Sequence, residues 1–313
     1  MNTLNAANVF VKGERQVSSR DSMMYLATKA MRTLPPYLSH RLALQILKYD
    51  LLPHAISNSD FLSTKLWGMN FSNPVGMSAG FDKGCEAVNG LFGMGFGFVE
   101  TGTVTPDPQS GNPRPNLFRL EEDRALVNWL GFPSCGLDKF SSRLEKTVGE
   151  RKGPTGANIG INSETKDPLE DITKCVEKLS PHCDYLVVNI SCPNTSGLTE
   201  WQTPKGVERM LVAAHEACSS TDRTPPILLK LSPDLDQFDL KPIVYSSIDA
   251  GVSGLIISNT TVSRPNTLKN ENARRRGGLS GVPLGFMSHE MLNCVYKITG
   301  GNLPLVAGGG ISS

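Results

Sequence analysis

The sequence predicts an α/β fold of the (β/α)8 barrel type, and three observations support this. Short apolar runs alternate with amphipathic segments from Asn73 to the end of the 313-residue chain, and strict strand–helix alternation implies a parallel sheet with right-handed crossovers. Polar or glycine residues follow nearly every apolar run, as in barrels that gather their chemistry at many strand ends. No run is followed by the Gly-x-Gly-x-x-Gly fingerprint of an open dinucleotide-binding sheet.

Seven strands are expected, each a short and mostly apolar run. They are Val75–Ala79, Phe98–Thr101, Ala157–Ile161, Tyr185–Ile190, Ile227–Leu231, Gly254–Ser258 and Leu305–Ala307. The segments between them predict helices at Glu86–Met94, Leu137–Val148, Pro168–Leu179, Gly206–Cys218, Leu240–Ala250 and Ser288–Ile298. The stretch that follows the second strand, to about Gly136, is rich in glycine and proline and predicts a long loop.

The residues before the first strand predict a separate extension. Residues 1–21 are polar and irregular, so a flexible segment is expected. Residues 22–53 contain two amphipathic helices, Ser22–Leu34 and Leu38–Leu52, each followed by proline. Two short helices cannot form a core of their own. Their apolar faces must lie on the main domain, on a membrane surface or around a ligand between the two. The expected barrel domain is 54–313.

Composition limits the classes of function. Hydrophobic residues make up 39% and charged residues 19% of the chain, as in a soluble globular protein. The net charge of +1 creates no overall field that would attract nucleic acid. The one basic run, Arg274–Arg276, is expected to be a solvated loop. The seven cysteines include no Cys-x-x-Cys pair, which argues against zinc sites, thioredoxin-type sites and a disulfide scaffold.

The most informative stretch is Asn189–Thr195, which begins at the end of the fourth expected strand. Asn189 and Asn194 each offer a donor and an acceptor, which suits a planar ligand that alternates N–H and C=O groups, such as a pyrimidine. Cys192 supplies a thiol that can act as a base or nucleophile if its pKa falls from about 8.5, and Pro193 holds it in extended geometry. The same residue types also suit an ordinary strand-to-loop turn.

Other strand ends carry further candidates. Lys83 and Lys230 need an anionic or electron-rich partner if they point into a barrel mouth, and surface snorkelling is the alternative for each. Gly308–Gly310 follows the seventh strand, where barrel loops often cradle a phosphate with backbone N–H groups. Ser280-Gly281 is a second candidate contact. Asparagines lie on separate loops of the same face, so the set describes a pocket for a phosphorylated planar cofactor and a small amide-bearing anion: Asn128, Asn189, Asn194 and Asn259.

Longer motifs lie in order along the chain, at Asn73-Pro74-Val75-Gly76, Ala79-Gly80-Phe81-Asp82-Lys83, Gly111-Asn112-Pro113-Arg114-Pro115, Asn189-Ile190-Ser191-Cys192-Pro193-Asn194-Thr195, Ser258-Asn259-Thr260-Thr261, Gly277-Gly278-Leu279-Ser280-Gly281 and Gly308-Gly309-Gly310. Together they resemble the dihydroorotate dehydrogenase family. The paired N-terminal helices, with Ser39-His40-Arg41-Leu42-Ala43, resemble its membrane-associated, quinone-using class (class 2).

The resemblance implies an FMN-binding TIM barrel that oxidises (S)-dihydroorotate to orotate in de novo pyrimidine (UMP) biosynthesis and passes the electrons through FMN to a quinone. The implied partners are dihydroorotate or orotate, ubiquinone and a membrane surface that the N-terminal helices contact. A monomer that binds no nucleic acid is expected. The implied location is the mitochondrial inner membrane, or the cytoplasmic membrane of a bacterium.

The resemblance also implies roles for individual residues. Positions that match the family's FMN site are Ala79, Gly80, Thr103, Asn158, Asn189, Lys230, Ser258, Ser280, Gly281, Gly309 and Gly310. Positions that match its dihydroorotate or orotate site are Lys83, Asn128, Gly131, Phe132, Asn189, Asn194, Asn259 and Thr260. Cys192 matches the base that takes a proton from C5 of the substrate, and His40 and Arg119 match the quinone tunnel beneath the helices. No metal is implied.

Two features depart from the family pattern. The quinone-using class has serine at the base, whereas Cys192 is typical of the soluble class that uses fumarate or NAD. That soluble class and a dihydropyrimidine dehydrogenase-like enzyme therefore stay open as alternatives. The chain also ends at Ser313, after the seventh strand and its loop, whereas the family continues through strand eight. The family's C-terminal part is thus expected to be lacking, and an inactive shortened chain that only binds a partner is a third alternative.

Overall fold

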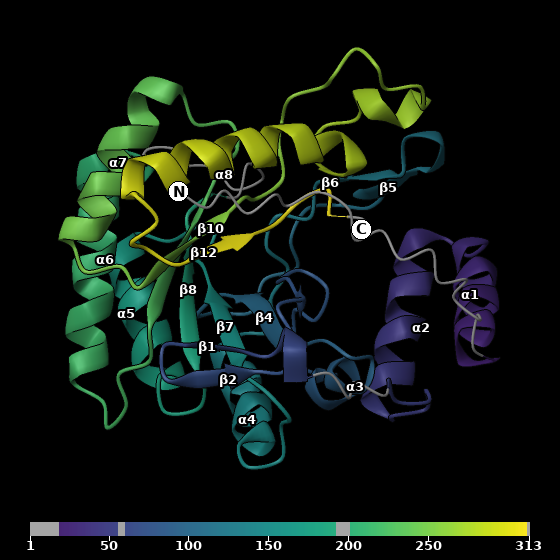
Figure 1. The fold of residues 1–313 in the computed structure, drawn as a ribbon, viewed down its shortest axis with the longest axis horizontal. Helices are drawn as coiled ribbons and strands as arrows, with labels where there is room; N and C mark the ends of the chain where they lie inside the picture. Colours follow the sequence, from purple (N-terminus) through teal and green to yellow (C-terminus); the bar gives the residue numbers. More distant parts are fainter. Residues whose placement is uncertain (1–18, 56–59, 192–200, 312–313) are drawn as a thin grey trace, which may run out of the picture.

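The computed structural model describes residues 19–55, 60–191 and 201–311. Within them, seven parallel strands form one sheet that curls into a half-barrel (Figure 1). The strands are β3 (Gly76–Met77), β4 (Phe98–Val104), β7 (Thr155–Ile159), β8 (Tyr185–Asn189), β9 (Ile227–Leu231), β10 (Gly254–Ile257) and β12 (Leu305–Ala307).

After β3, each of these seven strands pairs in parallel with the one before it in this set, so the order in the sheet is the order in the sequence. A doubly wound sheet would instead reverse direction at a switch point. The order therefore confirms the predicted barrel topology, and it brings the carboxyl ends of all seven strands to one edge.

Helices cover the outer face of the sheet (Figure 1). They are α3 (Val88–Gly93), α4 (Leu137–Thr147), α5 (Pro168–Leu179), α6 (Pro204–Ser219), α7 (Gln237–Asp249) and α8 (Gly285–Thr299). The start of α5 shows how the sequence sets such a boundary, because the Asp167 carboxylate accepts from the backbone N–H groups of Leu169 and Glu170, with Pro168 as the first helical residue. Short 3-10 turns lie at Asp60–Leu62, Glu121–Asp123, Glu271–Arg274 and Val282–Leu284.

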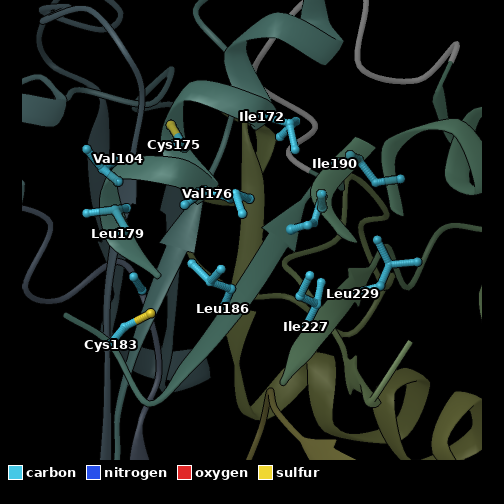
Figure 2. Close-up of a cluster of buried hydrophobic side chains, with 14 of the residues drawn as sticks. Val104, Ile172, Cys175, Val176, Leu179, Cys183, Leu186, Ile190, Ile227 and Leu229 are labelled. Atoms are coloured by element: carbon cyan, nitrogen blue, oxygen red, sulfur yellow. The ribbon is translucent and has the colours of Figure 1, made fainter. Parts of the chain in front are cut away.

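The main core lies between these helices and the sheet. Figure 2 shows the part formed by one face of α5 and the outward-facing side chains of β8 and β9. Removing each such side chain from water contributes roughly 1.5–3 kcal/mol, which fixes α5 and hence the strands beneath it. The side chains in this part of the core are at most 1% exposed and include Ile172, Cys175, Val176, Leu179, Leu186, Ile190, Ile227 and Leu229.

A hairpin that the sequence did not predict packs against the inner face of the sheet. Its strands are β1 (Thr64–Leu66) and β2 (Met69–Phe71). Trp67, in its turn, donates from Nε1 to the carbonyl of Ser253 at 3.0 Å. Trp67 also packs against Tyr185 of β8, with ring centroids 6.2 Å apart. The inner face is therefore filled by side chains and is a packed core, as in other barrels.

The predicted long loop before Gly136 is wrong in part. It contains β5 (Leu117–Leu120) and β6 (Ala125–Asn128), which form a three-stranded antiparallel sheet with β11 (Gly278–Gly281) in the order β11-β6-β5. Strand β11 pairs with a segment about 150 residues earlier, and no local pattern reveals such a contact. The small sheet lies beside the strand ends of the half-barrel (Figure 1).

The two predicted N-terminal helices are present as α1 (Ser19–Arg32) and α2 (Pro36–Lys48), both shorter at their C-terminal ends than expected. Helix α2 lies so close to α3 that a Cβ on Gly90 would overlap the backbone of Leu47. Leu47 is 6% exposed and joins the main core. None of the helices in the described ranges is long and apolar enough to cross a membrane.

Candidate functional site

Three predicted residues meet at the carboxyl ends of neighbouring strands. Thr103 lies on β4, Asn158 on β7 and Asn189 on β8, and all three are buried. The Nδ2 atom of Asn189 donates to Oγ1 of Thr103 and to Oδ1 of Asn158, each at 3.1 Å. The Thr103 hydroxyl donates to Oδ1 of Asn158 at 2.6 Å. The fold thus joins residues that lie as much as 86 positions apart into one polar network.

A buried ion pair adjoins this network. Lys230 on β9 is 5% exposed, and its Nζ lies 4.0 Å from Oε1 of Glu100 on β4. The same Nζ donates to Oγ of Ser78 at 3.5 Å. Glu100, 2% exposed, also accepts from Nδ2 of Asn158 at 2.7 Å. Lys230 is therefore no surface-snorkelling lysine, because it lies within the half-barrel with a carboxylate as partner.

The network continues to the end of β10. Nδ2 of Asn259 donates to Oγ of Ser191 at 3.0 Å and to Oδ1 of Asn189 at 3.4 Å. Ser191 in turn donates from its hydroxyl to the same Oδ1 at 3.2 Å. Cys192 and Asn194 lie outside the described residues, so their places in the site stay predictions from the sequence.

Glycines from two predicted phosphate loops meet at the N-terminal end of α8. A Cβ on Gly310 would overlap the backbone of Gly285 and lie 3.2 Å from the carbonyl oxygen of Gly281. Gly281 and Gly310 have φ of 95° and 72°, values that residues with a Cβ atom rarely adopt. Ser288 of α8 donates to the carbonyl of Gly309 at 2.9 Å. Backbone groups that approach this closely at a helix N-terminus suit an anion.

Gly281, Gly309 and Gly310 are called the glycine cradle below. Of the two predicted serine contacts, Ser258 lies next to this cradle and Ser280 is held by β6. The backbone N–H of Ser258 donates to the carbonyl of Gly308 at 3.0 Å, which places the glycine loop beside the end of β10. The hydroxyl of Ser280, on β11, is directed to the carbonyl of Leu126 at 3.5 Å. Ser258 is therefore connected directly to the predicted cradle, while Ser280 reaches it through its neighbour Gly281.

The loop after β3 is held against the end of β4. Gly80, with φ of 109°, donates its N–H to the carbonyl of Gly102 at 2.8 Å. Both Ala79 and Gly80 are half-buried in this loop. Nζ of Lys83 lies 3.7 Å from the place where a Cβ on Gly80 would be. The half-buried Lys83 ammonium therefore reaches back over the loop that the sequence assigned to the cofactor.

Asp82 anchors this loop, a role the sequence analysis did not assign. Its fully buried carboxylate accepts from the N–H groups of Glu86 and Ala87, each at 2.8 Å. Burial raises the pKa of Asp82 above its usual value, and the two N–H donors oppose that rise. The anchor fixes the backbone on the N-terminal side of Lys83.

Several predicted substrate residues lie on or beside the small sheet. Asn128, at the end of β6, pairs with Gly278. The bridge between Thr261 and Leu279 joins the Asn259–Thr260 segment to the same sheet. Phe132 is 7% exposed, and its ring would lie 3.0 Å from a Cβ on Gly160, just beyond the end of β7.

The Gly131–Phe132 turn is itself fixed by Gln109, which donates from Nε2 to the Phe132 carbonyl at 2.8 Å and the Gly131 carbonyl at 3.3 Å. Both residues have positive φ, at 68° for Gly131 and 49° for Phe132. Asn128, at the end of β6, and the Gly131–Phe132 turn therefore belong to one stretch of chain, which leads from β6 to α4.

His40 and Arg119 contact different parts of the helical extension. Nε2 of His40, on α2, donates to the carbonyl of Phe81 at 2.7 Å, directly next to the buried Asp82. Arg119, on β5, donates from Nη1 to the carbonyls of Arg32 at 2.8 Å and Leu34 at 2.7 Å. The structure thus ties α2 to the Lys83 loop and the α1–α2 connection to the small sheet.

The donor set fits a phosphorylated, planar, hydrogen-bonding cofactor of the flavin type. The glycine cradle offers backbone N–H groups and a helix end for a phosphate, and the buried Lys230 and the amides offer donors to a ring rich in carbonyl groups. Within the described ranges, no group of three or more histidine, cysteine and acidic residues is placed to hold a metal ion.

Sequence reasoning missed several residues that organise this site. Glu100 is a charged residue inside the predicted apolar strand Phe98–Thr101. This position could have indicated a functional role, because a buried carboxylate needs a partner. Ser191 was part of the singled-out stretch and received no role. Arg264, which donates to six backbone carbonyls, gave no local sign of its function. The loop Arg274–Arg276 is exposed as expected, and Arg276 also lies 4.8 Å from the centroid of the Trp129 ring.

Comparison with known proteins agrees with this geometry. Residues 61–313 match the family "Dihydroorotate dehydrogenase". A dihydroorotate dehydrogenase (quinone) of Xanthobacter autotrophicus is 44% identical, covering 90% of this chain and 81% of the relative. The mitochondrial dihydroorotate dehydrogenase (quinone) of Mus musculus is 43% identical, covering 92% and 75%.

Two solved structures of DHODH from Eimeria tenella, one with ferulenol and one ligand-free, superpose with a TM-score of 0.86 at 37% identity. Each covers 89% of this chain, and the chain covers 81% and 84% of them. The family match at residues 61–313 includes the half-barrel and its strand ends. The chain belongs to the dihydroorotate dehydrogenase family, in its quinone-using class.

Proposed function

We propose that this chain oxidises (S)-dihydroorotate to orotate, a step of pyrimidine biosynthesis, and passes the electrons by way of FMN to a quinone. The observation that carries the proposal is the buried network at the strand ends, in which three asparagines, Thr103 and the Glu100–Lys230 pair meet at one edge. Family membership supports a flavin, and the residues of this network and of the glycine cradle fit FMN.

In this proposal the two halves of the mouth hold different ligands. The cofactor residues are those of the loop after β3, the strand ends and the cradle, namely Ala79, Gly80, Thr103, Asn158, Asn189, Lys230, Ser258, Ser280, Gly281, Gly309 and Gly310. The substrate residues are Lys83, Asn128, Gly131, Phe132, Asn189, Asn194, Asn259 and Thr260. The Lys83 ammonium pairs with the substrate carboxylate, and the amides orient the pyrimidine ring by matched donors and acceptors.

Cys192 is the proposed base. As a thiolate, its Sγ takes the proton from C5 of dihydroorotate. When bound, FMN supplies the two-electron acceptor for the hydride from C6. The amides and Lys83 hold the ring so that C5 faces the thiolate, and the packed interior beneath Lys230 excludes water from that side.

The helical extension, residues 22–53, is proposed to form the quinone entrance, with His40 and Arg119 at its inner end. Apolar side chains on α1 and α2 are exposed in the structure, among them Tyr25, Leu26 and Leu38, and an interfacial helix pair would bury such residues in a membrane surface. We propose a peripheral contact with the membrane that holds the quinone, the mitochondrial inner membrane or a bacterial cytoplasmic membrane, and a monomeric enzyme.

The test begins with the purified chain. We expect bound FMN that denaturation releases, flavin bleaching by dihydroorotate without oxygen, and recovery of the colour when a quinone is added. Recovery with fumarate or NAD⁺ instead would favour the soluble alternatives that Cys192 left open. A colourless chain that dihydroorotate does not affect would contradict the proposal.

The matched variants are Lys230→Met and Lys174→Met. The first removes the buried cation and should lower the flavin content, because the ring loses its charged donor. The second removes an exposed lysine that pairs with Glu170 on α5, and its flavin content should equal that of the parent chain. Equal flavin content in both variants would remove Lys230 from the cofactor site.

A further inference from the structure

We propose that Glu100 is a positioning residue that fixes the orientation of the Asn158 amide, and with it the hydrogen bonds that Thr103 and Asn189 donate to that amide, and that it balances the charge of Lys230. The inference rests on the proposed function, since its consequence is the way the amides meet flavin and substrate. Glu100 lies in the middle of β4 and its side chain is 3% exposed. Its carboxylate therefore interacts with protein groups, Asn158 and Lys230, and hardly with solvent.

The first step of the argument is chemical. A carboxylate can only accept hydrogen bonds, whereas an amide can turn to present either its oxygen or its nitrogen. Oε1 of Glu100 lies 2.7 Å from Asn158, so the Asn158 atom on that side must be Nδ2. Its Oδ1 is thereby turned towards Thr103 and Asn189.

The second step follows along the network. Because Oδ1 of Asn158 accepts, Thr103 donates its hydroxyl proton there, and Asn189 donates from Nδ2. Oδ1 of Asn189 is then left to accept from Ser191 and from Nδ2 of Asn259. Oδ1 of Asn259 accepts from the N–H of Thr260 at 2.8 Å. One acceptor-only group on β4 thus sets the orientation of the Asn158 amide. Asn189 and Asn259 take the orientation that matches it, and each has its Oδ1 also held by a backbone N–H, that of Ser191 at 3.4 Å and that of Thr260 at 2.8 Å.

The third step concerns charge. The side chains of Lys230 and Glu100 are 6% and 3% exposed, and their charged atoms lie 4.0 Å apart. A buried cation without a partner is costly, and the neighbouring Ser78, Thr103, Asn158 and Asn189 carry no charge. Without Glu100, the positive charge of Lys230 would be uncompensated beside the proposed cofactor residues, and it would favour electron uptake by a flavin held there.

The decisive variant is Glu100→Gln, which keeps the shape, removes the charge and allows either amide atom to face Asn158. We expect the reduction potential of the bound flavin to rise by about 30 mV, which corresponds to about a tenfold change in a two-electron equilibrium. We also expect the dissociation constant of orotate, followed by the flavin spectrum, to rise about tenfold, or about 1.4 kcal/mol.

Two further variants separate positioning from folding. Glu100→Asp keeps the charge and shortens the reach, so the flavin potential should stay at the parent value while orotate binds more weakly. Asp184→Asn removes a partly buried carboxylate that pairs with Arg151 at 2.8 Å, just before the start of β8 and so at the opposite end of the strands. It should lower the unfolding temperature and leave the flavin potential and orotate binding unchanged.

The outcomes are distinguishable. A parent chain that takes up no FMN, or is not bleached by dihydroorotate, contradicts the proposed function itself. A parent chain that does both, with parent-like potential and orotate binding in Glu100→Gln, overturns the role of Glu100. If Glu100→Gln does not fold, Glu100→Asp decides alone: weakened orotate binding supports the positioning role, and binding equal to that of the parent refutes it.

Discussion

Cys192 is the residue on which the proposed chemistry depends most. A serine hydroxyl is a poor base unless its proton moves onward, whereas a thiol with a pKa near 8.5 is a few per cent thiolate at neutral pH. We expect the rate of flavin reduction by dihydroorotate to rise with pH as the thiol ionises and to level off above its pKa. In Cys192→Ser the rise should continue to higher pH. Anaerobic flavin bleaching in a stopped-flow instrument measures both profiles.

Cys192→Ala provides the control for binding. It should bind orotate like the parent chain, because the asparagines and Lys83 remain, and reduce flavin at least about a hundredfold more slowly, the usual contribution of a positioned base. Bleaching at the parent rate would leave Cys192 without a catalytic role. Three buried cysteines are poor alternative bases, since burial raises the pKa of Cys183 to about 12 and raises the pKa of Cys85 and of Cys175 as well.

At the scale of an element, the loop between β10 and β11 depends on one arginine. Arg264 donates from Nε to the carbonyl of Ala273 at 2.7 Å and from Nη2 to that of Gly277 at 2.7 Å. Its Nη1 donates to the carbonyls of the preceding residues, among them Ser263 at 3.0 Å. Burial lowers the pKa of Arg264 from its ordinary value, and nearby Asp234 opposes that effect. The planar guanidinium therefore holds both ends of the loop at once.

We expect Arg264→Lys to lower the free energy of unfolding by about 2 kcal/mol, because lysine keeps the charge but cannot replace a forked set of hydrogen bonds. Orotate binding should weaken in parallel, since the same loop carries Thr260 and leads into β11. Urea unfolding and an orotate titration measure the two effects. Arg274→Lys is the matched control, because Arg274 is exposed on the same loop. Equal stability in both variants would contradict the role of Arg264.

At the scale of the whole molecule, the sequence predicted those strands and helices whose bounds follow from the local pattern of apolar and polar residues. The bounds of β9 and β12 agree with the prediction, and α5 begins and ends where its aspartate cap and apolar face require. The hairpin β1–β2 and the small sheet were not predicted because their strands are only three or four residues long and Gly278 of β11 pairs with Asn128 of β6, about half the chain length away. Likewise, motif matching found Asn158 and Lys230, but only the fold brings Glu100 between them.

Helices α1 and α2 lie together at one side of the molecule (Figure 1), and several of their apolar side chains are exposed. They include Tyr25 at 68%, Leu26 at 63%, Leu38 at 51% and Leu42 at 43% exposed. The charged residues of the same helices from Lys29 to Lys48 are all basic. Apolar side chains that alternate with cations suit the interface of a membrane, which is where a long-chain quinone resides.

The double variant Leu38→Asp, Leu42→Asp tests this surface. Moving a leucine from water into an apolar phase contributes roughly 1.5–3 kcal/mol, so partition onto phospholipid vesicles should fall at least about tenfold. Flavin reduction by dihydroorotate should be unchanged, while reoxidation by a vesicle-bound quinone should slow. Phe238→Asp, on α7 and 89% exposed, is the control and should affect neither. If the double variant reoxidised as fast as the parent chain, the helices would pack on the barrel without delivering quinone; if flavin reduction fell as well, their contact with the Phe81–Lys83 loop would be what the variant had disturbed.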